Sequence, residues 1–166
     1  MTKPICYFLV GAPYMGKSHY VDNDKELSVL PVVSSDRELF ALCDKAGLSY
    51  QEGFGRFYLA AKDAMHKRLA EVLAKRSDFV YDRTNMTAES RSGMLQRLKK
   101  AGYEVRCLNF GVPVTQAEKD LVAKRRKERL RQVIPEDVFE SMCSHFAPPT
   151  LSEGFDQILQ VRMRNL

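Results

Sequence analysis

The segment Gly11-Ala12-Pro13-Tyr14-Met15-Gly16-Lys17-Ser18 decides how the rest of the chain is interpreted. It matches the pattern G-x-x-x-x-G-K-[ST]. An uninterrupted apolar run at residues 5–10 precedes it, and a helix can begin at Lys17. A strand, a glycine-containing loop and a helix in this order predict a phosphate-binding loop at the end of a parallel strand.

Each position of this loop has a physical role. Glycines let the backbone curl so that successive N–H groups point at phosphate oxygens, and the following helix presents its positive end to the same anion. Lys17 then reaches the β- and γ-phosphates, and the Ser18 hydroxyl binds Mg²⁺. We therefore expect ATP and Mg²⁺ as cofactors. The predicted ATP-binding residues of this segment are Gly11, Ala12, Pro13, Tyr14, Met15, Gly16, Lys17, Ser18 and His19.

Short apolar runs alternate with helical patterns along the rest of the chain. The strand-like runs are residues 5–10, 29–33, 79–81, 105–110 and 157–161. The helical patterns cover residues 18–26, 37–45, 57–75, 87–101, 115–131 and 135–145, and residues 47–55 suggest a mobile loop. This alternation predicts one α/β domain over residues 1–166, with a central, mainly parallel sheet covered by helices in three layers.

Three residues mark helix ends in this prediction. Thr87 is a plausible N-cap, and Gly102 is a plausible left-handed residue at the end of the same helix. Pro135 suits the first position of the helix predicted at residues 135–145.

The composition is that of an ordinary soluble domain, with 45% apolar and 28% charged residues. The first apolar run is too short to span a bilayer and lacks a small-residue cleavage pattern, so we expect a cytoplasmic protein. The four cysteines and three histidines lack zinc-ligand spacing, so we expect reduced, buried thiols and no zinc site. The cysteines are Cys6, Cys43, Cys107 and Cys143.

The net charge of +5 is modest, but its placement is uneven. Between Lys119 and Arg131 the basic residues are Lys119, Lys124, Arg125, Arg126, Lys127, Arg129 and Arg131, against Asp120 and Glu128. Such a stretch suits the phosphates of a nucleic acid or a nucleotide, or is a solvated helix face. Charge alone does not choose between them.

Two aspartates follow predicted strands, where open parallel sheets gather their ligands. Asp36 comes just after the second strand-like run and is a candidate general base for an attacking hydroxyl; the alternative is an N-cap for the next helix. Asp82 follows the run at residues 79–81. It is a candidate to bind Mg²⁺ through water or to hold a phosphate-binding arginine, and otherwise a turn residue.

Arg125 and Arg129 lie four residues apart, hence on one face of a helix. Two guanidinium groups on one face suit the closing of a helical lid, near residues 115–135, over the transferring phosphoryl group. The alternative is that both are solvated. In the first case Arg129 is a catalytic residue together with Lys17 and Asp36.

With these residues the chain resembles the phage-type polynucleotide kinase domain, a P-loop kinase that phosphorylates 5′-hydroxyl ends. The resemblance covers nearly the whole chain. It is carried by the phosphate-binding loop, by Ser35-Asp36, by Val80-Tyr81-Asp82-Arg83-Thr84-Asn85, which resembles the family's D-T-N segment, and by Arg125-x-x-x-Arg129 ahead of Val133-Ile134-Pro135-Glu136-Asp137-Val138. It implies that Asp36 is the general base, that Arg129 contacts the ATP phosphates and that Asp82 supports the site.

The chain departs from the family's pattern in three ways. Leu39 stands where members often have an acceptor-binding arginine, and Arg37 is the candidate substitute. Arg83 is an extra residue within the D-T-N segment. The predicted acceptor-binding residues are thus Arg37, Asp82 and Arg83. No counterpart of the family's fused phosphatase domain is present, so we expect no end-healing by this chain alone.

Three functions follow from these patterns. The first is a kinase for a hydroxyl of nucleic acid, DNA before RNA, either at a 5′ end or on a hydroxymethyl pyrimidine as in related phage kinases. The second is a small-molecule or nucleotide kinase on the same fold. The third is a nucleotide-binding module without phosphoryl transfer, which Asp36 disfavours. We expect no membrane association and no obligate protein partner. If the chain is phage-encoded, the expected location is the host cytoplasm.

Overall fold

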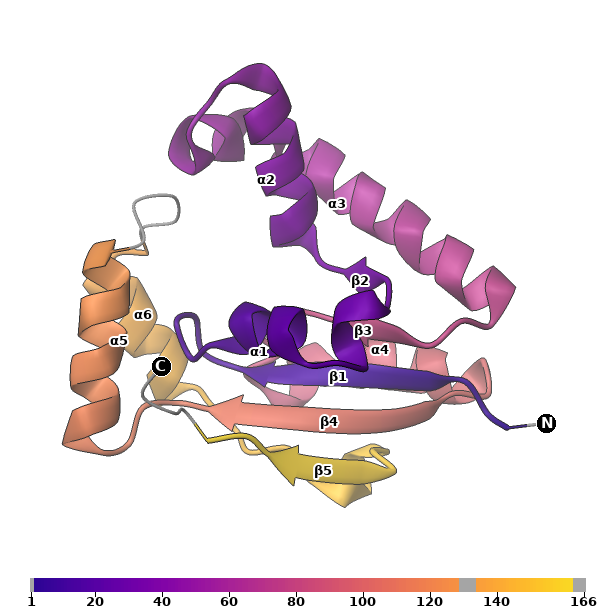
Figure 1. Ribbon diagram of the computed structural model, residues 1–166. Helices are drawn as coiled ribbons and strands as arrows, with labels where there is room; N and C mark the ends of the chain where they lie inside the picture. The colour runs from indigo at the N-terminus through magenta and orange to yellow at the C-terminus, as the bar shows by residue number, and fades with distance from the viewer. Residues whose placement is uncertain (1, 129–133, 163–166) are drawn as a thin grey trace.

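The central sheet confirms the predicted fold class. The computed structural model describes residues 2–128 and 134–162. Its strands are β1 (Ile5–Gly11), β2 (Val32–Val33), β3 (Phe79–Tyr81), β4 (Glu104–Gly111) and β5 (Gln157–Gln160). They form one five-stranded sheet in the order β2-β3-β1-β4-β5, and every pairing between neighbours is parallel. The carboxyl ends of all these strands therefore share one edge (Figure 1).

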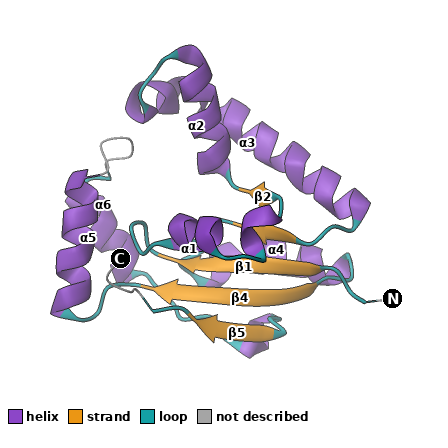
Figure 2. Cartoon of the chain, viewed as in Figure 1, coloured by secondary structure: helices purple, strands orange, loops and turns teal. Residues whose placement is uncertain are grey.

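Helices cover both faces of this sheet (Figure 2). They are α1 (Lys17–Asn23), α2 (Ser35–Ala46), α3 (Tyr50–Lys75), α4 (Ala88–Lys100), α5 (Gln116–Glu128) and α6 (Glu136–Ser144), with 3-10 turns η1 (Leu27–Val29) and η2 (Leu151–Glu153). Successive residues of β1 point to opposite faces, and Phe8 and Leu9 are both fully buried. Phe8 packs in a cluster with residues of α3 and α4, whereas Leu9 packs with residues of α1, α5 and α6.

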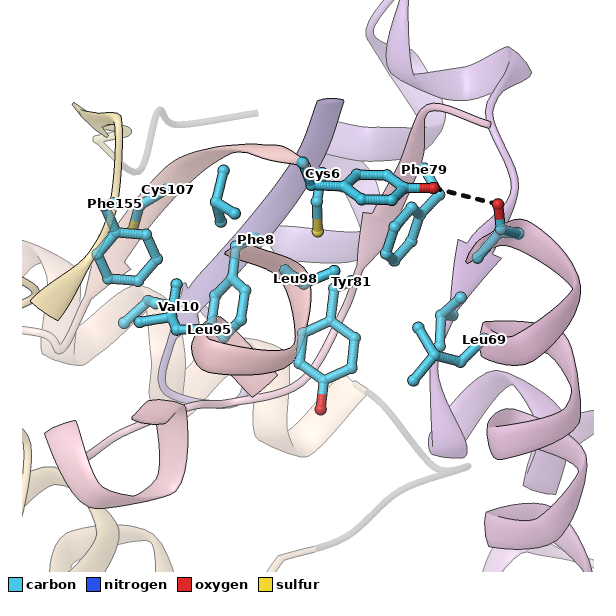
Figure 3. Packing of buried hydrophobic residues seen from close by; sticks show 14 of the residues in the cluster. Cys6, Phe8, Val10, Leu69, Phe79, Tyr81, Leu95, Leu98, Cys107 and Phe155 are labelled. Carbon is cyan, nitrogen blue, oxygen red and sulfur yellow. Dashed lines mark hydrogen bonds between the residues drawn. The ribbon is translucent and has the colours of Figure 1, made fainter. Parts of the chain in front are cut away.

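Aromatic contacts fix the middle of this core. The Phe8 ring lies between Tyr81 of β3 and Phe155, with ring centroids 5.0 and 5.4 Å apart (Figure 3). The buried Tyr103 hydroxyl donates to the carbonyl oxygens of Val72 and Ser77, which holds the end of α3 against the sheet. Each aromatic pair of this kind contributes about 0.5–1.5 kcal/mol to stability beyond the burial of its apolar area. They hold β3 firmly at the point from which Asp82 projects.

Two local predictions are wrong. The strand expected at residues 29–33 is limited to Val32–Val33, because Leu30 N–H bonds to the Leu27 carbonyl and closes η1 instead. The mobile loop expected at residues 47–55 is mostly helix. Ser49 and Glu52 form a reciprocal capping box that starts α3 at Tyr50, despite the glycines that follow.

The predicted helix ends are mostly confirmed. Thr87 caps α4 through the Ser90 N–H, and Gly102 has φ of 79° just beyond the end of that helix. Pro135, however, is the N-cap of α6 and not its first helical residue. Residues 129–131 of the helix expected at 115–131 lie outside the described residues; α5 covers the rest apart from Thr115.

Helices α2 and α3 form an antiparallel pair that projects from the side of the sheet bounded by β2 (Figure 1). The pair has a small core of its own, built on Leu39, Cys43 and Ala61. A Cβ atom at Gly53 of α3 would collide with the Cys43 sulfur, so the two helices approach as closely as they do because residue 53 is glycine. The salt bridge between Arg68 and Glu38, 2.6 Å, ties the helices together further along.

The cysteines are free, as expected, and three of them are buried. Burial raises the pKa of the Cys107 thiol to about 12, so this group is inert at neutral pH. Within the part of the chain that the structure describes, no helix has the length and apolarity needed to cross a bilayer.

Candidate active site

The phosphate-binding loop leaves β1 in an unusual conformation. Tyr14 and Gly16 have φ of 65° and 89°, in the left-handed region, and a Cβ at Gly11 would lie 2.8 Å from the Phe110 Cβ. A left-handed tyrosine is rare, and here its ring is buried against Phe139, with its hydroxyl accepting from Ile134 N–H. Burial of the side chain thus holds the backbone curl that the glycines permit.

Neighbouring segments clamp the loop through backbone hydrogen bonds. Gly11 N–H donates to the Thr84 carbonyl and Ala12 N–H to the Gly111 carbonyl, both at 2.9 Å. Asn85, with φ of 51°, donates its side-chain amide to the Leu9 carbonyl at 2.7 Å. The segment after β3 is therefore bonded to β1 and to the loop that follows it.

Lys17 and Arg125 meet at this loop, as their predicted roles require. The Lys17 ammonium donates to the carbonyls of Gly11 and Ala12 at 2.7 and 2.8 Å. Arg125 of α5 donates to the Tyr14 carbonyl at 2.9 Å, and a Cβ at Gly16 would lie 3.3 Å from its Nη1. The solvated alternative is wrong for Arg125. Arg129 lies outside the described residues.

A cluster of charged side chains surrounds Asp82 at the end of β3. Asp82 is 8% exposed, and burial raises the pKa of its carboxyl group. The charges of Lys17 and Arg37 lower that pKa, whereas those of Asp36 and Asp22 raise it. Side chains from the phosphate-binding loop, α1, α2 and β3 are therefore close enough to influence one titration. This cluster brings together four predicted site residues, Lys17, Asp36, Arg37 and Asp82.

Asp36 lies in the first turn of α2 and is exposed. The Tyr50 hydroxyl of α3 donates to its Oδ1 at 3.1 Å. Ser34, and not Asp36, is the N-cap of α2, because its side chain accepts from Arg37 N–H at 3.3 Å. The capping alternative for Asp36 is therefore wrong, and its carboxylate is oriented by a tyrosine.

The predicted acceptor residues Arg37 and Arg83 lie far apart in the sequence and differ in their surroundings. Arg37 forms a 2.8 Å salt bridge with Asp22, and its Nε is buried without a hydrogen-bond partner among the described residues. An unpaired buried N–H is costly unless an acceptor reaches it. Arg83 is half-buried beside the Tyr81 hydroxyl, whose pKa is raised by burial and lowered by that arginine.

One cavity adjoins the phosphate-binding loop, and a second lies beside the segment after β3. The first, about 950 Å³, lies between α1, α5 and the ends of β4 and β5, and Gly16, His19 and Arg125 line it. The second, about 700 Å³, lies between the β3–α4 segment and α6, and Arg83, Asn85 and His145 line it. Both have the volume of small-ligand sites. The predicted ATP residue His19 therefore lies at a cavity and not on the phosphate loop itself.

The residues present fit a magnesium nucleotide. Mg²⁺ in phosphate sites keeps several waters and takes only one or two protein oxygens beside those of the phosphates. Ser18 and Asp82 would supply these oxygens. Among residues 2–128 and 134–162, no three His, Cys, Asp or Glu side chains form a metal cluster, and Mg²⁺ of this kind needs none.

Sequence reasoning missed Arg91, which is fully buried within α4. It donates to both Glu153 oxygens at 2.8 and 3.1 Å, and to the carbonyls of Asn85 and Ala147 at 2.9 Å. Arg91 therefore positions the segment that carries Asn85 without facing the site itself. Its partner Glu153 is 62 residues away in the sequence, and no local signal distinguishes Arg91 from a solvated helix arginine.

The parallel sheet, the glycine loop and the bonded lysine define a P-loop kinase-type domain. The comparisons agree, since the family described as AAA domain matches residues 7–149, and the chain belongs to that family. A bifunctional polynucleotide phosphatase/kinase of Schizosaccharomyces pombe is 30% identical over 108 residues, covering 65% of this chain and 26% of that protein. The match thus spans about a quarter of the yeast protein.

Solved structures show the same fold at low identity. A candidate kinase from Chloroflexus aurantiacus has a TM-score of 0.69 at 18% identity and covers 98% of this chain and 86% of its own. A protein of the PezAT toxin-antitoxin system of Streptococcus pneumoniae has a TM-score of 0.59 at 18% identity, with 98% and 69% covered. A gluconokinase from Sinorhizobium meliloti 1021 has a TM-score of 0.54 at 16% identity, with 100% and 86% covered.

Proposed function

We propose that this chain transfers the γ-phosphoryl group of ATP to a hydroxyl of nucleic acid, with Mg²⁺. The observation that supports this best is the cluster of Lys17, Asp36, Arg37 and Asp82 beside the phosphate-binding loop. A nucleotide-binding module has no use for a carboxylate there, whereas a kinase needs one to receive the proton of the attacking hydroxyl. The similarity to a polynucleotide phosphatase/kinase supports the acceptor class.

The proposed reaction uses each side of the site once. Asp36 accepts the proton of the acceptor hydroxyl, whose oxygen attacks the γ-phosphorus while the bond to the ADP oxygen breaks. Lys17, the loop N–H groups and Arg125 stabilise the charge that develops on the phosphoryl oxygens. The 950 Å³ cavity beside His19 is the space for the nucleoside of ATP. The unpaired Nε of Arg37 is a donor for a phosphate or hydroxyl of the acceptor.

A panel of acceptors tests this proposal. The protein is incubated with labelled ATP and 5′-hydroxyl DNA, 5′-hydroxyl RNA, duplex DNA containing hydroxymethyluracil, free nucleosides, or gluconate. Label transferred to any of the three nucleic acids supports the proposal and identifies the hydroxyl. Label transferred only to a nucleoside or to gluconate contradicts it, and hydrolysis or binding of ATP without any transfer favours a nucleotide-binding module.

The salt dependence of acceptor binding is a second test of the acceptor class. The basic stretch that begins at Lys119 would release counterions from nucleic-acid phosphates on contact. Affinity for the acceptor should therefore fall as salt rises. Equal affinity at 50 and about 200 mM salt would favour a small uncharged acceptor.

A small-molecule kinase is the second candidate, and the 700 Å³ cavity favours it. That cavity lies beside Arg83 and His145 and is large enough to enclose a metabolite. The same panel separates the two functions, because a metabolite kinase would leave all three nucleic acids unlabelled.

A further inference from the structure

Helix α3 begins with aromatic side chains at four-residue steps, Tyr50, Phe54 and Tyr58, which lie on one helix face. Phe40 of α2 extends the series. Successive ring centroids are 5.0, 5.8 and 5.1 Å apart, with interplanar angles of 43°, 42° and 38°. These four residues form a continuous series of rings, called the aromatic row below.

The two ends of the aromatic row have different surroundings. Tyr50 packs against the small core between α2 and α3, so the inner rings serve the fold. Phe54 and Tyr58 are 44% and 39% exposed, and the neighbouring Leu59 is 72% exposed. Paired exposed rings stabilise a helix by only about 0.2–0.5 kcal/mol. Stability of the helix therefore explains the outer rings poorly.

The α3 part of the aromatic row starts beside the candidate general base. The Tyr50 hydroxyl donates to Asp36 Oδ1 at 3.1 Å, so the first ring of α3 touches the carboxylate that would receive the acceptor's proton. From Tyr50 to Tyr58 the row runs about 12 Å along α3, at 1.5 Å per residue. This length accommodates about three bases at the 3.4 Å spacing of a stacked strand.

Cations accompany the exposed rings. Lys62 is the next residue on the same face after Tyr58. Arg56 is exposed and stands between Phe54 and Tyr58 in the sequence, although its guanidinium lies 5.2 Å from the ring of Phe57, which belongs to the α2–α3 core. The nearby acid Glu52 is engaged at the start of α3, where bonds to Ser49 lower its pKa. Exposed aromatic faces flanked by cations are the usual means of holding single-stranded nucleic acid without reading its sequence.

We propose that Phe54 and Tyr58 stack the bases of a single-stranded acceptor next to the hydroxyl that Asp36 deprotonates. This inference rests on the proposed function and sharpens it, since a stacking surface requires unpaired bases. Stacking contributes about 1–3 kcal/mol per base, which corresponds to a tenfold or greater change in affinity. Because every base has two such faces, single-stranded DNA and RNA should both bind.

Binding is measured first, because it needs no turnover. A labelled ten-nucleotide thymidine strand is titrated with the wild-type protein, with Phe54→Ala/Tyr58→Ala, and with Leu59→Ala as the control. Leu59 is more exposed than either ring and lies beside them, so it matches the loss of apolar surface without removing a ring. We expect the double variant to bind at least about tenfold more weakly, and Leu59→Ala to bind as the wild type does.

Transfer is measured second, as the ratio of KM for a 5′-hydroxyl decamer to KM for a dinucleotide. This ratio should rise at least about tenfold in the double variant, and Phe54→Trp/Tyr58→Trp should restore it because tryptophan keeps the stacking faces. Equal strand affinity in the wild type and the double variant overturns the stacking proposal. A third outcome separates the two proposals. If the double variant binds the strand more weakly but the wild type labels no nucleic acid, the stacking surface is supported and only the proposed kinase function is contradicted.

Two further measurements distinguish loss of stacking from a folding defect and from binding of double-stranded nucleic acid. Thermal melting of each variant detects a loss of structure, and the tryptophan variant keeps the test open if the alanine variant melts early. A fully paired duplex offers no free base faces along its length, so its affinity should not respond to Phe54→Ala/Tyr58→Ala. A duplex that loses as much affinity as the single strand contradicts stacking.

Discussion

The two sides of the candidate active site are built on different supports. The donor side is the phosphate-binding loop, bonded through Gly11 and Ala12 to the β3–α4 segment and to the end of β4. The acceptor side is the α2–α3 pair, which carries Asp36 and rests on a small core of its own. Backbone hydrogen bonds of the sheet fix the donor geometry. The acceptor geometry depends instead on side-chain packing between α2 and α3, on the burial of the second half of α3 against the sheet, and on the Arg37–Asp22 salt bridge. We therefore expect changes at the α2–α3 contact to affect the acceptor side more than the donor loop.

The largest expected effect comes from removing Lys17 on the donor side. Lys17→Ala should lower transfer at least about a thousandfold, because the ammonium stabilises charge that develops on the phosphoryl group. Its ammonium donates to the carbonyls of Gly11 and Ala12, and the side chain is only half-buried, so the fold should persist. Turnover and melting temperature are measured beside Lys25→Ala, an exposed lysine of the same region. Near-normal turnover in a folded Lys17→Ala protein would show that the loop is not the catalytic donor site.

The next effect belongs to the acceptor side. Asp36→Asn keeps the size of the side chain and its hydrogen bond with Tyr50 but loses the proton acceptor, so turnover should fall about 10²–10⁴-fold. ATP affinity and melting temperature should stay near those of the wild type, because Ser34 and not Asp36 caps α2. Turnover is measured with saturating ATP and acceptor. An asparagine variant with normal turnover contradicts the general-base role.

Asp82 lies between the two sides, and its expected effect on turnover is smaller, about tenfold, as for groups that orient a metal or a ligand. Burial raises its pKa in the folded protein above the unfolded value. The folded state therefore binds the proton of the Asp82 carboxyl more strongly than the unfolded state does. The free energy of unfolding of the protein decreases as pH rises through the folded pKa of Asp82. Asp82→Asn removes this loss, so the variant should melt higher than the wild type at pH 8.

The matched control for Asp82→Asn is Asp63→Asn, which removes one exposed carboxylate from α3. The advantage of Asp82→Asn should shrink as pH falls toward the unfolded pKa of aspartate, near 4, because below this pH the carboxyl is protonated in both the folded and the unfolded state. Melting curves from pH 4 to 8 measure this. A variant that melts lower than the wild type by the same amount at every pH would mean that Asp82 stabilises the fold as a carboxylate.

Sequence reasoning correctly predicted the strand, loop and helix of the donor side because their determinants are local. The residues from Gly11 to Ser18 follow one another, and the pattern alone implies the turn, the lysine and the helix. On the acceptor side it singled out Asp36 as a candidate, and this role stays a prediction. It wrongly placed a mobile loop where α3 begins, because Gly53 and Gly55 resemble loop residues. The reason for Gly53 lies in Cys43 on another helix, and the reason for Arg91 lies in Glu153; neither contact leaves a local trace.

The smallest expected effect on turnover, and the most direct test of the acceptor side's support, compares two glycines of α3. Replacing glycine by alanine inside a helix stabilises it by about 1 kcal/mol when space allows. At Gly55 no atom lies within 4 Å of the new Cβ, so Gly55→Ala should raise the free energy of unfolding by about that amount. At Gly53 the Cβ would collide with the buried Cys43 sulfur. Overpacking of this kind costs about 1–3 kcal/mol, so Gly53→Ala should be destabilising despite its better helix propensity.

Because the Gly53 contact joins α2 to α3, relief of the collision should move Asp36 with α2. Gly53→Ala should therefore raise KM for the acceptor a few-fold while KM for ATP stays within about twofold, since 1 kcal/mol corresponds to about fivefold. The double variant Cys43→Ala/Gly53→Ala removes the colliding sulfur, so its KM for the acceptor should return close to the wild-type value. Its free energy of unfolding should recover less, because the packing contacts of the Cys43 sulfur are not replaced. Urea unfolding and steady-state kinetics measure the two properties separately. Equal changes in KM for ATP and for the acceptor would mean that the α2–α3 contact supports the donor loop as well, and the two sides would then form one structural unit.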